Sequence, residues 1–141
     1  MKFRQILVCL LFFLAACGVG RTPSKDRFET ISKVKLPSDH KILKDEYQGM
    51  LQDYTILFDI QLTNKSADEL TKSIKQSAYF NPAVTHQGLL FDSLYVHIDT
   101  TKSVWCKSKE GYMFHSEQGR TEYWVWFDTL TKKVSYKEFA D

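Results

Sequence analysis

The change of hydrophobic period near residue 63 constrains the fold of this 141-residue chain more than any other feature. In the segment YTILFDIQL, residues 54–62, every even-numbered residue is apolar, and every odd-numbered residue except Leu57 is polar. A period of two predicts a strand with one buried face. The segment KILKDEY, residues 41–47, precedes it, and Gly49 supplies a turn former between them. We therefore expect a β-hairpin.

The period then becomes helical. The segment NKSADELTKSIKQSAYF carries apolar residues at helical spacing: Ala67, Leu70, Ile74 and Ala78. Ser66 followed by Glu69 is the pattern of a capping box, and Asn81-Pro82 closes the helix. Two segments stay open: 28–36 between a strand and one or two helical turns, and 83–100 between helix, strand and packed loop.

The C-terminal third predicts a meander of strands. KSVWCK, EGYMFHSE, TEYWVWFDT and KKVSYKEF are separated by segments rich in turn formers. A switch from strands to one helix and back to strands favours an α+β domain. We expect a mostly antiparallel sheet with one main helix packed on it.

The strand EYWVWF is apolar on both faces. Trp124 and Trp126 share one face, and Tyr123, Val125 and Phe127 share the other. Such a strand is expected in the centre of the sheet, with the helix over one face. The other face would be covered by residues 83–100, by the N-terminal residues, or by a ligand or partner.

Trp124 and Trp126, with Trp105, form the candidate binding residues, and Tyr112 and Tyr136 could extend the same surface. An exposed aromatic strip suits stacking on sugar rings or contact with a protein. The alternative, which is more common for such rings, is that they belong to the core.

The N-terminus carries a short apolar block. Lys2 and Arg4 precede eleven uncharged residues, 6–16, which are too few to span a bilayer. A basic start, a short apolar segment and small residues before a cleavage point indicate an export signal.

The residues Leu14-Ala15-Ala16-Cys17 resemble the lipobox of bacterial lipoproteins. The resemblance implies diacylglyceryl transfer to the Cys17 sulfur, cleavage after Ala16, and often acylation of the new amino group with palmitate. Gly18, with no nearby aspartate, resembles lipoproteins sent to the outer membrane of some Gram-negative bacteria. The alternatives are a signal without lipid or an uncleaved anchor.

Removal of the signal changes the composition. The chain holds 19 basic and 17 acidic residues, and loss of Lys2 and Arg4 leaves 17 of each. A neutral balance argues against nucleic-acid binding, which needs a basic face. We expect a cleaved signal (1–16), a flexible tether (17–27) and one α+β domain (28–141).

Candidate catalytic residues are few. The sequence contains no phosphate-binding glycine loop, nucleophile elbow or paired-cysteine zinc motif. His97 with Asp99 would make at most a weak metal site, and we expect no metal or other cofactor. Cys106 with His115 could be a nucleophile and base, although a buried structural thiol is the commoner role.

Six carboxylates lie in or beside the expected strands: Asp53, Asp59, Glu110, Glu117, Glu122 and Asp128. Two of them could meet at the separation that glycoside hydrolysis needs, but chance pairs are expected among 17 acidic residues.

The sequence therefore favours a non-enzymatic, lipid-anchored module of the bacterial envelope that binds a protein or glycan. A small hydrolase using a carboxylate pair or Cys106 and a carrier of an apolar ligand are the alternatives.

Overall fold

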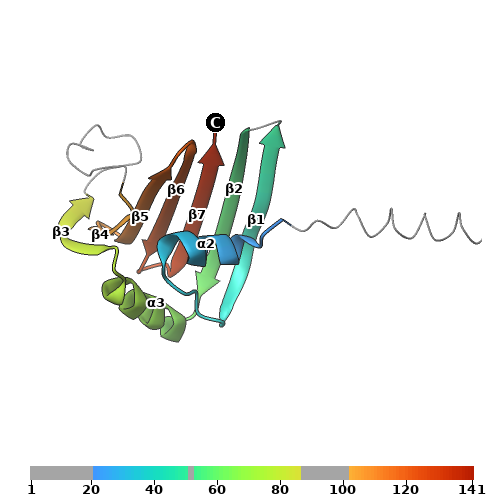
Figure 1. Ribbon diagram of the computed structural model, residues 1–141. Coiled ribbons are helices and arrows are strands. Elements are labelled where there is room, and N and C mark those ends of the chain that lie inside the picture. Colours follow the sequence, from blue (N-terminus) through green and yellow to red (C-terminus); the bar gives the residue numbers. More distant parts are fainter. Residues whose placement is uncertain (1–20, 51–52, 87–101) are drawn as a thin grey trace, which may run out of the picture.

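The computed structural model describes residues 21–50, 53–86 and 102–141, which form two helices and one seven-stranded sheet (Figure 1). The elements are α2 (Ser24–Ser32), β1 (His40–Met50), β2 (Asp53–Leu62), α3 (Asn64–Gln76), β3 (Phe80–His86), β4 (Val104–Ser108), β5 (Gly111–Gln118), β6 (Thr121–Asp128) and β7 (Lys133–Ala140). The strand order is β1-β2-β7-β6-β5-β4-β3, and every neighbouring pair is antiparallel except β3–β4.

The predicted α+β class with a mostly antiparallel sheet is confirmed. The expectation of one main helix is wrong, because α2 is a second helix. It begins at Ser24, so the segment 17–27, expected to be a tether, contributes its last residues to a helix. Phe28 and Ile31 lie three residues apart, on one side of α2, and both are buried.

The predicted hairpin of β1 and β2 is confirmed, and β2 alternates between buried and half-buried residues as its sequence does. Gly49 lies within β1, opposite Tyr54, so it is a strand residue and not part of the turn. A side chain at Gly49 would collide with the ring of Tyr47, so this glycine makes room for a tyrosine instead of making the turn.

Helix α3 is confirmed, but its cap differs from the prediction. Thr63 is the N-cap residue, and its hydroxyl accepts a hydrogen bond from the Ser66 backbone N–H at 3.3 Å. The Ser66 hydroxyl instead donates to the Asp39 carbonyl oxygen at 2.8 Å. The helix ends at Gln76, before Asn81-Pro82, which lies in β3.

The four C-terminal strands are confirmed, and β6 lies between β5 and β7 as its two apolar faces require. The order of the sheet has one non-local feature: β7, the last strand, pairs with both β2 and β6. This strand joins the N-terminal hairpin to the C-terminal meander. Of the open segment 83–100, residues up to His86 belong to β3 and the rest lie outside the described residues.

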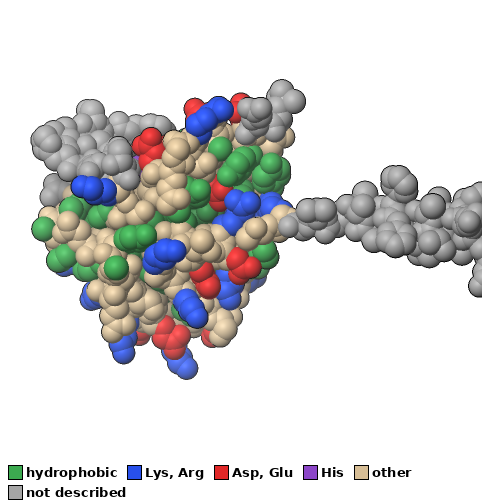
Figure 2. Space-filling model, in the orientation of Figure 1, with side chains coloured by type: hydrophobic (Ala, Val, Ile, Leu, Met, Phe, Trp, Pro, Cys, Tyr) green, Lys and Arg blue, Asp and Glu red, His purple; other side chains and the backbone are tan. Residues whose placement is uncertain are grey.

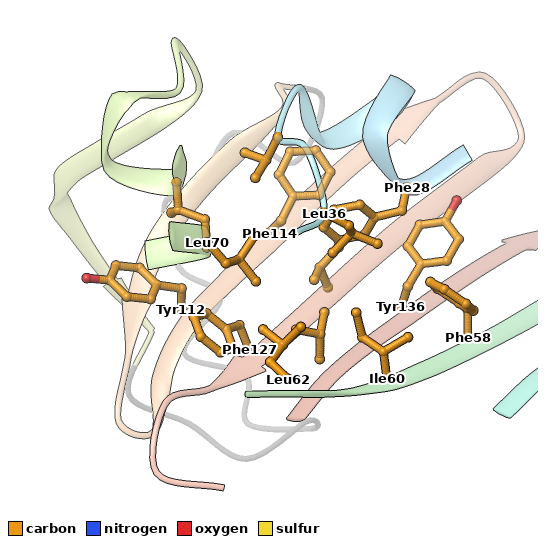
Figure 3. Close-up of a cluster of buried hydrophobic side chains, with 14 of the residues drawn as sticks. Phe28, Leu36, Phe58, Ile60, Leu62, Leu70, Tyr112, Phe114, Phe127 and Tyr136 are labelled. Atoms are coloured by element: carbon orange, nitrogen blue, oxygen red, sulfur yellow. The ribbon is translucent and has the colours of Figure 1, made fainter. Parts of the chain in front are cut away.

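The core lies between the two helices and one face of the sheet, which we call the helix face (Figures 1 and 3). Figure 3 shows Phe28, Leu36 and Leu70 above side chains that rise from the sheet. The sheet supplies Ile56, Phe58, Ile60, Leu62, Trp105, Tyr112, Phe114, Val125, Phe127, Val134 and Tyr136. Burial of each large apolar side chain contributes about 1.5–3 kcal/mol. No helix within the described ranges is long and apolar enough to cross a membrane.

Candidate functional site

The opposite side of the sheet, which we call the open face, carries no helix among the described residues. Cross-strand register places Leu57, Lys137, Trp124 and His115 in one row across β2, β7, β6 and β5. The next row contains Asp59, Ser135, Trp126 and Met113. Side chains on β2, β7 and β6 are half-buried here, whereas Met113 and His115 are fully buried. The accessible part of the open face is therefore centred on β6 and β7.

Trp124 and Trp126 form the centre of this surface. Their rings are parallel, with an interplanar angle of 0° and centroids 5.5 Å apart. Alternation along β6 places both indoles on one face of the sheet, as predicted, and the register shows that this is the open face. Beside them, the Lys137 ammonium lies 5.1 Å from the centroid of the Phe139 ring. Aromatic and charged groups are thus mixed on one accessible strip.

Glu122 is held in place beside the two tryptophans. Its Oε1 accepts a hydrogen bond from Trp124 Nε1 at 2.9 Å and lies 3.0 Å from His115 Nε2. His115 is buried, and the Glu122 side chain is 30% exposed. The Glu122 carboxylate is therefore partly accessible to solvent while a buried histidine holds it in place. Because both of these contacts use Oε1, Oε2 is oriented and has no hydrogen-bond partner among the described residues, so it can accept from a ligand.

Glu117 lies directly opposite Glu122 in the β5–β6 register. Side chains of directly opposite residues share a face, with Cβ atoms about 4.5–5.5 Å apart. Two carboxylates therefore lie together next to Trp124, although Glu117 is exposed on the surface. Of the six carboxylates that the sequence suggested, Glu117 and Glu122 are the two that best match the expected pair.

The remaining predicted carboxylates serve local structure. Asp59 forms an ion pair with Lys133 at 2.8 Å. Asp128 accepts the Thr131 and Leu130 backbone N–H groups in the β6–β7 turn, and the bond from Thr131 chiefly lowers the pKa of Asp128. Glu110 is exposed, and Asp53 is exposed with its carboxylate 3.9 Å from Arg120.

Trp105 does not join the other two tryptophans. It lies opposite Phe114 on the helix face, is 0% exposed, and donates from Nε1 to the Ser32 carbonyl oxygen at 3.0 Å. Tyr112 and Tyr136 also belong to the core. For these three residues the core interpretation holds.

Cys106 and His115 share the open face but are not directly opposite each other. Cys106 pairs with Met113, and His115 pairs with Val104. Both residues are buried, so neither touches solvent in the described arrangement. Among residues 21–50, 53–86 and 102–141, no cluster of histidine, cysteine and carboxylate side chains could hold a metal ion. His97, Asp99 and Cys17 lie outside those ranges.

A second polar cluster, on the helix face, was not predicted. Glu138 is 1% exposed, and its Oε1 lies 2.7 Å from Arg27 Nη1 and accepts a hydrogen bond from the Tyr54 hydroxyl at 2.5 Å. Its Oε2 accepts from the Tyr136 hydroxyl at 2.6 Å. Burial, reinforced by the hydrogen bond to Glu138, raises the pKa of Tyr136 and of Tyr54.

The sequence of β7, KVSYKEFA, contains a pattern from which this cluster could have been predicted. Val134, Tyr136 and Glu138 recur at period two, which places a carboxylate on the core face of β7. A pocket of about 260 Å³ adjoins the cluster and is lined by Arg27, Tyr123 and Gln118, among others. Both carboxylate oxygens of Glu138 already accept hydrogen bonds, so the cluster fastens α2 to the sheet rather than presenting a base.

The fold and the site define an α+β protein with both described helices on one face of a mostly antiparallel sheet and an aromatic, carboxylate-bearing strip on the other. No protein-family model matches the chain, no curated protein is significantly similar to it, and no solved structure matches it.

Proposed function

We propose that the chain is a lipid-anchored module of the bacterial envelope, expected at the outer membrane, that binds a glycan through its open face. The observation that carries the binding site is the parallel pair Trp124–Trp126 next to the oriented carboxylate of Glu122. The lipobox-like residues ending in Cys17 support the anchor and the location.

The chemistry of the strip favours a glycan over a protein partner. Sugar rings offer C–H faces that pack on indoles and hydroxyl groups that donate to carboxylates. Here Glu122 Oε2 and the Glu117 carboxylate lie beside an indole, and Lys137 supplies a donor in the row of Trp124. A protein hot spot would instead be expected to be a more apolar patch with fewer charges at its centre.

A glycoside hydrolase is the second candidate, because Glu117 and Glu122 are opposite each other. The acid of such a pair is usually buried, whereas Glu117 is exposed. The buried thiol of Cys106 gives less support. Among the described residues, buried core side chains lie between the helices and the sheet, and they give no support to a carrier of apolar ligands (Figure 3).

Titration calorimetry of the full-length protein in mild detergent tests the proposal, with a β-1,4-linked N-acetylglucosamine tetramer as the probe. We expect Trp126→Ala to weaken binding by about 2 kcal/mol or more, a ~30-fold loss. Glu122→Gln should weaken it less, and Trp105→Phe, a change in the core, should bind like the parent. Equal binding by parent and Trp126→Ala, or no binding by the parent, would contradict the proposal.

The same samples separate binding from hydrolysis. A binding module releases no new reducing ends during a prolonged incubation with the tetramer. Release that depends on both Glu117 and Glu122 would favour the hydrolase instead.

A further inference from the structure

The outer strand β1 carries an unusual share of exposed apolar surface. Four large hydrophobic residues are strongly exposed among the described residues, and three of them lie on β1: Ile42 at 54%, Leu43 at 49% and Tyr47 at 52%. Figure 2 shows hydrophobic side chains gathered where the C-terminal end of β1 meets the beginning of β2. Apolar side chains concentrated on one edge mark an interaction site more often than scattered ones do.

The backbone of β1 is also open to pairing. In the part of the chain that the structure describes, β1 pairs with β2 alone and forms one edge of the sheet. An edge strand of eleven residues presents a row of N–H and C=O groups that can accept another strand. Natural proteins usually block such an edge or use it.

The β1 register fixes which side chains share a face. Asp45 lies opposite Phe58 and so points to the helix face, whereas Lys44 and Glu46 lie opposite Asp59 and Leu57 on the open face. A register shift between Ile42 and Lys44 returns Ile42 to the helix face, opposite Ile60. Leu43 is the extra residue of this bulge.

This pattern is self-complementary. If β1 pairs antiparallel with a second β1 about a two-fold axis at Asp45, Lys44 lies opposite Glu46 of the second copy, on the same face. Beyond the bulge, Ile42 lies opposite Tyr47 of the second copy, also on one face. Opposite charges and apolar–aromatic pairs are the cross-strand contacts that stabilise antiparallel sheets.

At the axis the negative charges of the two Asp45 carboxylates would face each other, but neighbouring groups of each copy offset them. Each accepts a hydrogen bond from Ser24 at 2.6 Å and forms an ion pair with Arg21 at 2.8 Å. Arg21 and Ser24 of both copies would therefore lie beside the axis. Such copies can be anchored in one membrane, although the pairing itself does not depend on the proposed anchor.

We propose that β1 is a homodimer interface in which the β1 strands of two copies pair antiparallel and join their sheets into one. The open face with Trp124 and Trp126 stays accessible in this arrangement, because the new contact is at the sheet edge.

Disulfide trapping in native membranes, with the full-length chain, tests the interface. In Asp45→Cys, the two introduced thiols face each other across the axis, at a Cα separation that a disulfide can span. We expect a dimer band on non-reducing gels, verified by mass spectrometry. Lys65→Cys, on the exposed side of α3, and the parent should give several-fold less dimer. Co-expressed Ile42→Cys and Tyr47→Cys copies should cross-link to each other, which tests the register without altering Asp45.

A charge swap decides whether the pairing is specific. In the Asp45→Cys background, Lys44→Glu should suppress the dimer, and Lys44→Glu with Glu46→Lys should restore it. Cross-linking no greater than in Lys65→Cys, or suppression without rescue, would overturn the proposal. A cross-linked product with a different protein would show another occupant of β1 and would overturn it as well.

Discussion

Arg27 Nη1 lies 2.7 Å from Glu138 Oε1 and joins α2 to the last strand of the sheet. The two residues are 111 positions apart in the chain, and Glu138 is almost completely buried. A buried carboxylate without its cation is costly. This ion pair therefore fixes α2, the first described element, on the helix face.

Replacement of Arg27 by Met should lower the free energy of unfolding by about 2–4 kcal/mol, because the Glu138 carboxylate stays buried without its cation. Urea denaturation followed by circular dichroism measures the loss. Arg120→Met is the matched control, since the Arg120 side chain is 70% exposed and 3.9 Å from Asp53; it should cost less than about 0.5 kcal/mol. Equal costs for both variants would refute the role of the Arg27–Glu138 pair.

Stability should fall at alkaline pH through Tyr136. Burial and the hydrogen bond to Glu138 raise the pKa of Tyr136 above its ordinary value of 10.0. The tyrosine therefore contributes stability that is fully present below about pH 10 and is lost as the pH rises toward the folded-state pKa. Thermal melts between about pH 8 and about pH 11 should show this decline, and Tyr136→Phe should make it shallower. An unchanged slope in Tyr136→Phe would show that other groups cause it.

The structure and the sequence pattern assign different N-cap residues to α3, Thr63 and Ser66, and mutations can decide between them. Thr63→Ala removes the acceptor for the Ser66 N–H and should cost about 1 kcal/mol. Glu69, the expected capping-box residue, is 53% exposed and lies 3.9 Å from Lys65, so Glu69→Ala, which removes the acceptor that a capping box would need, should cost less than about 0.5 kcal/mol. The two costs, measured by urea denaturation, would be reversed if Ser66 and Glu69 formed the cap.

The elements with a clear local period were predictable. The alternation of β2 and the two apolar faces of β6 each follow from side-chain direction within a single strand. The sequence left residues 28–36 open between a strand and one or two helical turns, because α2 has nine residues, of which only Phe28 and Ile31 are both apolar and buried, so no full helical pattern develops. Its stability comes from packing rather than from its own sequence.

Contacts between distant segments were not predictable from the sequence. The position of β7 between β2 and β6, the Arg27–Glu138 pair and the support of Glu122 by His115 all depend on tertiary packing. Trp105 and Trp124 look alike in the sequence, but register places them on opposite faces. The sequence therefore named Trp124, Trp126 and Glu122 as candidates, but it did not show that Glu122 is held by Trp124 and His115, or that Trp105 belongs to the core.

Cys17 is the predicted point of lipid attachment. Cys17→Ser should remove the diacylglyceryl thioether and release the protein from the membrane fraction, because two or three acyl chains anchor a protein stably and none remain in the variant. Mass spectrometry of the N-terminal peptide and membrane fractionation are the measurements. Cys106→Ala is the control and should keep the lipid. An intact Met1 or an unmodified Cys17 in the parent would contradict lipidation.

Tryptophan fluorescence of the Trp105→Phe variant tests the glycan site most directly, because Trp124 and Trp126 are then the chain's remaining tryptophans. Their emission is recorded while the β-1,4-linked N-acetylglucosamine tetramer is added, in the presence and absence of iodide. We expect iodide to quench the emission of the protein alone, and the tetramer to change the emission saturably and protect it from iodide. Emission that iodide does not quench, or that the tetramer neither changes nor protects, would contradict a glycan site at Trp124 and Trp126.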